Sequence, residues 1–303
     1  MSVCAPIANH LYSKEISCFD KAALVRLANA WNESHPDDRI RNIAKASRKQ
    51  LWSAIKNKMS PKCKTGGKSN GKGENIEACW VDHLASANDP IHKKLRPVEP
   101  KEWKKNPYEW LSNFDIEDAM QQYEDDKSYK FKFIGVFPVD FAIKTGIFGK
   151  CLYEETCNID FQRLVKKGIE YAGMVINMDH HDEPGSHCTA LFIAMNPKSP
   201  LYGAYYYNSV PNPPPKEVEA YMKMLKNKAE ELTPNVPFKL QYNTYQHQYK
   251  NTECGLFSMA YLVRWLVLLQ KNPSTDFEKV VKISIRDEHV HKLRKLFFRP
   301  RTV

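Results

Sequence analysis

The chemistry of this sequence centres on one cysteine, Cys254, which lies within residues 248–258. Residues 240–245 upstream are rich in β-forming side chains, and residues 256–269 downstream form a long apolar run without a helix breaker. This pattern predicts that an extended segment turns into a helix at Cys254. The positive end of a helix dipole favours a thiolate over a thiol, so Cys254 is a candidate nucleophile. The alternative is an inert buried thiol, because free cysteines are often buried.

A thiolate nucleophile needs a base and a group that orients that base. His187 stands at the start of an apolar strand that ends at Met195, and Asn208 lies at the polar end of a second strand of residues 204–209. If the two strands are adjacent and antiparallel, both side chains lie at the same sheet edge. Asn208 can then accept a hydrogen bond from the imidazole and hold its ring without adding a charge.

Acyl transfer also needs donors for the developing oxyanion. Gln248 lies six residues before Cys254 and carries an amide N–H that can serve. The backbone N–H of Cys254 at the helix start is a second candidate donor. The four catalytic candidates are therefore His187, Asn208, Gln248 and Cys254.

The order His, Asn, Gln, Cys, with Gln-x5-Cys-Gly at the nucleophile, resembles the ubiquitin-like-protein protease family. That family includes SUMO-specific proteases, the adenovirus protease and proteases of large DNA viruses such as African swine fever virus. The viral members are similar in having an Asn in place of the triad acid, Thr-Glu-Cys-Gly around the nucleophile, and a strand end like Tyr207-Asn208-Ser209. The resemblance covers residues 106–303.

Two further positions gain a role from this resemblance. Trp110 matches the tryptophan that lines the family's tunnel for the last glycines of the substrate. The alternative is an aromatic side chain packed under a helix cap. Family members usually carry a tryptophan directly after the catalytic histidine, where it covers that tunnel, and this chain has Cys188 there. Trp110 and Cys188 are therefore the candidate substrate-binding residues.

The resemblance implies a cysteine endopeptidase that needs no cofactor or metal. Its substrates would be viral structural polyproteins or capsid and core precursors, cut at Gly-Gly-X-like sites during virion maturation, in the host cytoplasm and the virion. Three alternatives remain open. They are an isopeptidase that removes ubiquitin or SUMO, an acyltransferase with the same triad order, and a nucleic-acid-binding module with a vestigial triad.

The net charge of +10 over 303 residues is concentrated in one segment. A stretch that begins at Arg39 and ends with Lys72 contains eleven basic and no acidic residues. It could contact DNA or another polyanion, or it could be a solvated helix face followed by a loop. No apolar run is long enough for a membrane span, and residues 1–10 lack a secretion signal pattern.

Eight irregularly spaced cysteines do not indicate a disulfide framework, so we expect a reducing setting. Cys63, Cys79 and His83 could be partial zinc ligands, but no second close pair of ligands accompanies them. Ordinary free thiols are the favoured interpretation, and no metal site is predicted.

The expected fold is of the α+β class: a cysteine-protease fold with a central, mostly antiparallel sheet flanked by helices, plus a mainly helical N-terminal arm. Apolar residues at helical spacing predict a helical hairpin in the first sixty residues. A proline-rich, charged stretch at residues 90–107 is the candidate boundary. We therefore predict a basic arm domain at residues 1–105 and a protease domain at residues 106–303.

Overall fold

The protein was analysed as a computed structural model, which describes residues 3–9, 17–63, 76–145, 149–282 and 285–302. The chain forms two compact units. The first comprises Met1–Glu99 together with Lys295–Val303, and the second comprises Pro100–Arg294. The compact units thus divide at residue 99, and residues 295–303 group with the first unit rather than with the second. The assignment of an arm domain and a protease domain stays a prediction.

The first unit is mainly helical. Its elements are η1 (Pro6–Ala8), α2 (Lys21–Ser34), α3 (Arg48–Met59), α4 (Ile76–Leu84) and η2 (Pro90–Lys94). The side chain of Asp20 caps α2 by accepting from Ala23 N at 2.8 Å, and Ser47 forms a capping box with Gln50 at the start of α3. The helices enclose a core that includes Phe19, Leu24, Ile55 and Trp80.

The C-terminal segment is bound within this first unit. The C-terminal segment continues from helix α11 (Asp287–Phe297), and Arg299 forms a parallel bridge with Val98. The guanidinium of Arg299 is only 3% exposed, and it donates to both carboxylate oxygens of Asp82 at 2.8 and 3.2 Å. Because the buried guanidinium binds both oxygens of one carboxylate, this contact holds the C-terminal segment in the first unit.

The expectation of no disulfide framework is wrong. Three disulfides join Cys4 to Cys18, Cys63 to Cys79, and Cys151 to Cys157, and only Cys188 and Cys254 are free. Irregular spacing concealed these pairs because packing of the elements, rather than a repeated interval, brings each pair together. Cys79, for example, lies on α4, whereas Cys63 follows the end of α3.

The second unit is an α+β domain built on one five-stranded sheet. Besides this sheet, the unit contains α-helices, short 3-10 helices and a small hairpin. In chain order its elements are η3 (Lys101–Lys104), α5 (Asn113–Asp125), η4 (Lys127–Tyr129), β1 (Phe131–Pro138), β2 (Lys144–Thr145), β3 (Lys150–Cys151), α6 (Glu154–Cys157), α7 (Phe161–Lys166), β4 (Tyr171–Asn177), β5 (Cys188–Ala194), β6 (Gly203–Tyr207), α8 (Lys216–Leu232), β7 (Lys239–Tyr242), α9 (Cys254–Lys271), α10 (Phe277–Val281) and the greater part of α11.

The strand order is β1-β4-β5-β6-β7, with β2 and β3 forming a separate hairpin. The β4–β5 and β5–β6 pairs are antiparallel, whereas the outer pairs β1–β4 and β6–β7 are parallel. The predicted fold class is confirmed, and the sheet is mixed rather than nearly all antiparallel. The antiparallel centre is what brings the end of β6 next to the start of β5.

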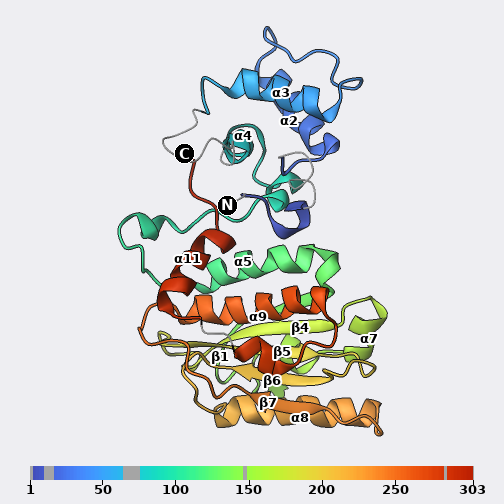
Figure 1. Ribbon diagram of the computed structural model, residues 1–303, viewed down its shortest axis with the longest axis vertical. Coiled ribbons are helices and arrows are strands. Elements are labelled where there is room, and N and C mark those ends of the chain that lie inside the picture. Colours follow the sequence, from blue (N-terminus) through green and yellow to red (C-terminus); the bar gives the residue numbers. More distant parts are fainter. Residues whose placement is uncertain (1–2, 10–16, 64–75, 146–148, 283–284, 303) are drawn as a thin grey trace. The chain divides into compact units, whose positions relative to one another are not determined.

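The two faces of the sheet are covered by different helices, with α5 and α9 on one side and α8 on the other (Figure 1). Residues alternate between these faces along β6, as the period of a strand requires. Tyr206 packs in the cluster that contains Tyr221 and Leu225 of α8. Tyr207 instead stacks on Tyr261 of α9, with ring centroids 4.3 Å apart. Helix α9 is thereby fixed against the strands that carry the candidate base.

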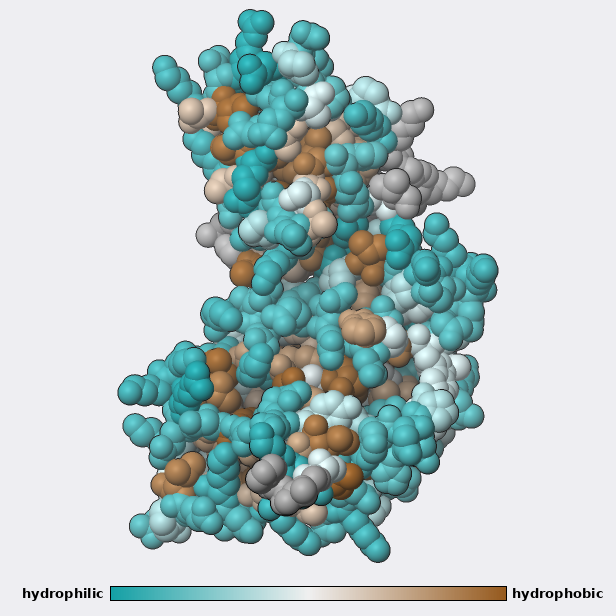
Figure 2. Space-filling view, turned by 180° about the vertical axis from the view of Figure 1, so that it is seen from behind, coloured by the Kyte–Doolittle hydropathy of each residue, from teal (hydrophilic) through white to brown (hydrophobic). Residues whose placement is uncertain are grey.

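Within the part of the chain that the structure describes, no helix has the length and apolar character needed to cross a membrane. Figure 2 shows hydrophilic side chains over most of the visible face, with hydrophobic side chains in small separate groups. The large apolar side chains that are exposed include Trp110 at 45% and Tyr249 at 56%. Both belong to the second unit, near the candidate nucleophile.

Candidate functional site

The nucleophile candidate Cys254 is the first residue of α9 and is 6% exposed. Residues 248–253 lead into it without regular structure, so the predicted change from extended chain to helix occurs at this residue. Gly255 follows, and a Cβ atom there would lie 3.4 Å from Ile116 and 3.7 Å from Leu111. These are ordinary van der Waals distances, and they show that α9 begins close to α5 and its preceding segment.

The base candidate His187 directly precedes β5, and Asn208 directly follows β6. His187 Nε2 and Asn208 Oδ1 are 2.8 Å apart. Asn208 Oδ1 also accepts from the backbone N–H of Val210 at 3.0 Å, so this oxygen acts as an acceptor and Nε2 of His187 must donate to it. The neutral imidazole therefore carries its proton on Nε2, and Nδ1 is left to take the proton of Cys254.

Asn208 is itself held rigidly, which matters because it sets the tautomer of the base. The residue is 2% exposed. Its backbone N–H donates to Asn243 Oδ1 at 2.8 Å, and its carbonyl accepts from Asn243 Nδ2 at 2.9 Å. Sequence reasoning missed Asn243, because a single asparagine after a strand gives no pattern that marks it.

The electrostatics favour a thiolate and an imidazolium. A hydrogen bond from Cys188 and another with His187 outweigh burial and lower the pKa of Cys254 to about 4. Burial lowers the pKa of His187, but its hydrogen bonds with Cys254 and Asn208 have the larger combined effect and raise it above 6.5. The sulfur and the imidazole therefore stabilise each other's charged forms.

Gln248 is buried next to these groups, and its amide is fixed at both ends. Ser209 Oγ donates to Gln248 Oε1 at 2.6 Å, and Gln248 Nε2 donates to the carbonyl of Lys250 at 2.5 Å. Nε2 carries two hydrogens, so one N–H is left for an oxyanion. The role of Gln248 as a donor stays a prediction.

Helix α11 holds the loop between Gln248 and Cys254 at two points. Asp287 accepts from the backbone N–H groups of Tyr249 and Lys250 at 3.1 and 3.2 Å. Glu253, 2% exposed, accepts from Arg294 Nη2 at 2.8 Å and pairs with His291 Nδ1 at 2.7 Å. Sequence reasoning did not identify these contacts, although Glu253 is the residue directly before the nucleophile.

Two hollows adjoin the candidate nucleophile and base. A cavity of ≈ 20 Å³ is lined by Cys254, Cys188, Trp110, Leu111 and Arg294, among others. A more open hollow of ≈ 540 Å³ is lined by His187, Gln248, Trp110 and Tyr249, among others. The predicted substrate-binding residue Trp110 lines both hollows, and Cys188 lines the smaller one.

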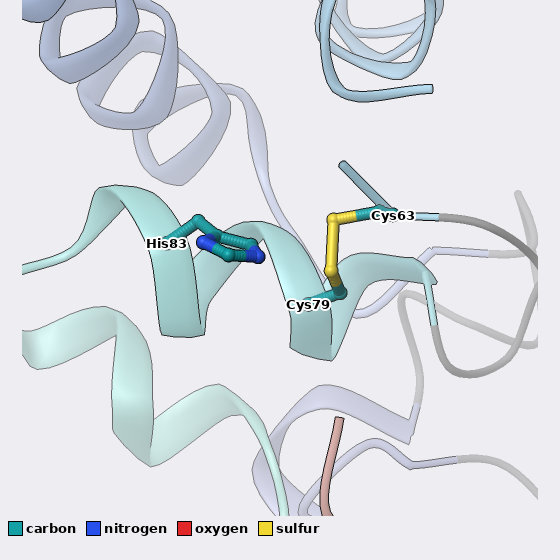
Figure 3. Close-up of side chains that lie close together, drawn as sticks. All are labelled: Cys63, Cys79 and His83. Carbon is teal, nitrogen blue, oxygen red and sulfur yellow. A yellow bond between two sulfur atoms is a disulfide. The ribbon is translucent and has the colours of Figure 1, made fainter. Parts of the chain in front are cut away.

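The candidate zinc ligands Cys63, Cys79 and His83 lie together in the first unit, with their ligand atoms within 4.8 Å of one another. Figure 3 shows His83 on the same helix as Cys79, whose sulfur is bonded to Cys63. Sulfurs bonded to each other offer no thiolate to a cation. In this bonded form, the cluster lacks the ligands that a zinc site needs.

No protein-family model matches the chain. Curated relatives are nevertheless found along its whole length. It is 28% identical over 320 residues to a putative thiol protease of Acanthamoeba polyphaga mimivirus, covering 99% of this chain and 94% of the relative. It is 25% identical over 193 residues to a cysteine protease of African swine fever virus, covering 62% and 67% respectively.

The fold has a solved counterpart. A crystal structure of the African swine fever virus protease matches with a TM-score of 0.60 at 21% identity, covering 86% of this chain and 94% of that one. The predicted resemblance and the fold class are therefore confirmed. The roles of the individual site residues stay predictions.

Proposed function

We propose that this chain, which is a cysteine protease of the viral, SUMO-protease-like kind, acts as an endopeptidase on viral structural polyproteins and capsid or core precursors. The observation that carries the proposal is the connected set Cys254, His187 and Asn208. The bond from His187 Nε2 to Asn208 leaves Nδ1 as the only ring nitrogen for the nucleophile. That arrangement suits acyl transfer through a thiolate.

The proposed reaction begins with attack of the Cys254 thiolate on the scissile carbonyl. The oxyanion accepts hydrogen bonds from the Cys254 N–H and the remaining N–H of Gln248. The His187 imidazolium then gives its proton to the leaving amine, which departs and leaves a thioester. Neutral His187 next takes a proton from water, whose oxygen attacks the thioester, and Cys254 leaves as a thiolate.

The size of the smaller cavity supports glycine-rich cleavage sites. About 10–15 Å³ holds one water molecule, so a hollow of ≈ 20 Å³ beside the nucleophile has no room for a bulky side chain. Trp110 and Leu111 line it with apolar surface. Arg294 also lines it, and its Nη1 is buried without a hydrogen-bond partner among the described residues. That N–H is suited to a substrate carbonyl, so we propose cleavage at Gly-Gly-X-like sites.

The test is a panel of Gly-Gly-X peptides, incubated with the wild type and with Cys254→Ala. We expect cleavage after the second glycine by the wild type, with rates falling when either glycine is replaced by leucine. The Cys254→Ala variant should lose activity by a factor of about 10⁴ or more, since it lacks the nucleophile. Equal cleavage by both proteins would refute the assignment of Cys254.

A second substrate class is favoured by the names of other relatives. A SUMO-1 cysteine protease of an African swine fever virus isolate is 28% identical over 137 residues, which cover 45% of this chain and 47% of that relative. A folded ubiquitin-like partner would present its C-terminal glycines to the same cavity. Labelling of Cys254 by SUMO or ubiquitin carrying a C-terminal vinyl sulfone would favour this substrate. Labelling by a short Gly-Gly peptide probe alone would favour polyproteins.

We propose that the enzyme acts during virion maturation, in the host cytoplasm and in the virion. The three disulfides suit an oxidising surrounding, so the bonded form fits the released particle better than the reducing cytoplasm. The contact of the basic stretch with DNA or another polyanion also stays a prediction. Part of that stretch, residues 64–72, lies outside the described residues.

A further inference from the structure

Three side chains of metal-binding type gather in the first unit, on α4 and just after α3. Cys79 and His83 are four residues apart on α4, so they lie one turn apart on the same face of that helix. Cys63 follows the end of α3, and its backbone N–H donates to the carbonyl of Met59 at 2.8 Å. Figure 3 shows the ring of His83 extending toward the two bonded sulfurs. Two separate elements therefore bring two sulfurs and an imidazole together.

The spacing of the ligand atoms in this cluster suits a zinc ion. The two sulfurs and a ring nitrogen of His83 lie within 4.8 Å of one another. Zinc bonds of about 2.0–2.3 Å in a tetrahedron place neighbouring ligand atoms roughly 3.4–3.8 Å apart. Sulfurs that are bonded to each other lie closer than this, so opening the disulfide lets them part toward the spacing that zinc requires.

Burial and charge also favour zinc once the disulfide is open. Cys63 and Cys79 are 4% and 6% exposed, so two free thiolates at these positions would be buried negative charges. Zn²⁺ bound by two thiolates and a neutral imidazole has no net charge, and it can be buried without that penalty. His83 is exposed, so an ion and a small reductant can reach the cluster from solvent. Thiolates with imidazole suit zinc, whereas magnesium and calcium prefer oxygen ligands.

We propose that Cys63, Cys79 and His83 bind zinc in the reduced chain, so that zinc and the disulfide are alternative cross-links between α4 and the end of α3. Two molecules of a small monothiol open the disulfide. The sulfur–sulfur bond breaks, the two cysteines gain two electrons and two protons, and the monothiol becomes a disulfide. Zinc then displaces the two protons and bonds to both sulfurs and one ring nitrogen. The cluster has three members among the described residues, so water takes the fourth position.

The alternative cross-links match the two surroundings proposed for this chain. A disulfide persists in an oxidising setting, whereas the reducing cytoplasm keeps thiols free to bind an ion. Zinc would then hold the same two elements together before the disulfide forms. A site with three protein ligands holds its ion less firmly than one with four, so we expect a chelator to remove the zinc without denaturant.

The test measures zinc binding to the full-length chain carrying Cys254→Ala, because the thiolate of the candidate nucleophile is then unable to bind the ion. The protein is reduced with a phosphine and titrated with zinc in competition with a chromophoric chelator. We expect about one zinc ion per reduced chain at this site and none in the oxidised chain. Adding His83→Ala should lower the affinity by more than the ~10–100-fold that loss of an outer-shell partner causes. His83 is exposed, so this variant should fold.

Matched controls in the same unit are His92→Ala and Cys4→Ser, each made in the Cys254→Ala chain. His92 lies outside the cluster, where its Nε2 is 2.9 Å from the carbonyl oxygen of Ser86. Cys4→Ser removes a different disulfide of the first unit. Both controls should bind zinc as tightly as the Cys254→Ala chain does.

Hydrogen exchange of peptides from α4 gives a second readout that requires neither substrate nor activity. In the reduced chain, zinc should slow exchange across Ile76–Leu84, and a chelator should reverse this protection. If the reduced chain unfolds without metal, as judged by circular dichroism, zinc is added before the reductant and should preserve the fold. The proposal would be overturned by a reduced chain that binds no zinc, by His83→Ala binding zinc as tightly as its parent, or by equal unfolding with and without zinc.

Discussion

The charge state of two residues, Cys254 and His187, sets the expected pH dependence of this site. Hydrogen bonds from Cys188 and His187 lower the pKa of Cys254 to about 4, and hydrogen bonds raise the pKa of His187 above 6.5 in spite of its burial. Acyl transfer needs the thiolate and the imidazolium together. We therefore expect kcat/KM for peptide cleavage to rise as Cys254 ionises near pH 4 and to fall above pH 6.5, as His187 loses its proton.

The measurement is a pH–rate profile with a Gly-Gly-X peptide, and its limbs report the apparent values of the coupled pair. An acid limb near 9, the ordinary value of the Cys254 thiol, would contradict the ion pair.

The orienting role of Asn208 gives a second prediction at this scale. Asn208→Ala removes the acceptor of His187 Nε2–H, so the ring can rotate and the proton can move to the nitrogen that should face Cys254. We expect kcat/KM to fall by at least about tenfold, and by no more than the ~10²–10⁴ that general-base catalysis contributes. Asn208→Asp should restore most of this activity, because a carboxylate accepts the same bond.

A matched control is Asn196→Ala, which replaces an asparagine beyond the far end of β5. Among the described residues, its side chain accepts only from the backbone N–H of Lys198. This control should cleave peptides at the wild-type rate. If Asn208→Ala did so too, the assigned orientation of the imidazole would be wrong.

At the scale of elements, α11 holds the loop that carries the nucleophile. Glu253→Gln keeps the size of the side chain but removes its charge, so the buried guanidinium of Arg294 loses its counter-ion. Removing one partner of a buried pair costs about 3–5 kcal/mol. We expect a loss of this order in the free energy of unfolding of the second unit, together with a fall in kcat, because the Cys254 backbone N–H is displaced.

Glu288→Gln is the control, because this residue lies on the same helix but, among the residues that the structure describes, forms only an exposed pair with Lys250. Such pairs contribute about 0–1 kcal/mol, so neither stability nor kcat should change appreciably. Chemical denaturation and peptide cleavage measure the two effects. A Glu253→Gln variant as stable as the Glu288→Gln variant would show that the buried pair does not secure the loop.

The sequence predicted those elements whose periodicity is strong. The apolar run after Cys254 became α9, and the strands beside His187 and Asn208 became the adjacent antiparallel pair β5 and β6. These elements could be predicted because apolar spacing and β-branched residues indicate local structure directly. The candidate base and its orienter could thus be assigned to one sheet edge before the structure was known.

The features that the sequence could not predict depend on contacts between segments far apart along the chain. Asp287 accepts a hydrogen bond from the backbone N–H of Tyr249, and Cys63 forms a disulfide with Cys79. No local sequence pattern predicts either contact. The parallel edges of the sheet have the same cause, since strand direction follows from connections rather than from residue spacing. The proximity of Cys188 to Cys254 likewise arises only when β5 meets the start of α9.

At the scale of the whole molecule, the C-terminal segment belongs to the first compact unit while α11 secures the nucleophile loop in the second. Within the first unit, Arg299 is 3% exposed and bonded to Asp82. Burial alone would raise the pKa of Asp82, but hydrogen bonds from Arg299 and Thr302 outweigh it and lower the value below 3.8. The stability from this carboxylate is therefore present above pH 3.8 and is lost as the pH falls through its folded value.

Asp82→Asn should weaken this anchor, because the guanidinium of Arg299 then lacks a charged partner. We expect a loss of about 1.5–3 kcal/mol in the first unit, the value of a hydrogen bond to a charged group. Hydrogen exchange read by mass spectrometry can follow the two units separately. Peptides from residues 17–63 and 76–99 should exchange faster in the variant, whereas peptides from the five-stranded sheet should not.

The control for this last prediction is Asp38→Asn, which removes the 61% exposed partner of Lys58 in the same unit and should change the exchange rates little. Peptide cleavage reports the second unit. Retained cleavage with faster exchange in the first unit would mean that the two units unfold separately. A parallel loss of cleavage would instead mean that the anchoring of the C-terminal segment is transmitted through α11 to the loop before Cys254. Exchange in Asp82→Asn no faster than in Asp38→Asn would refute the anchoring role of the Arg299 pair.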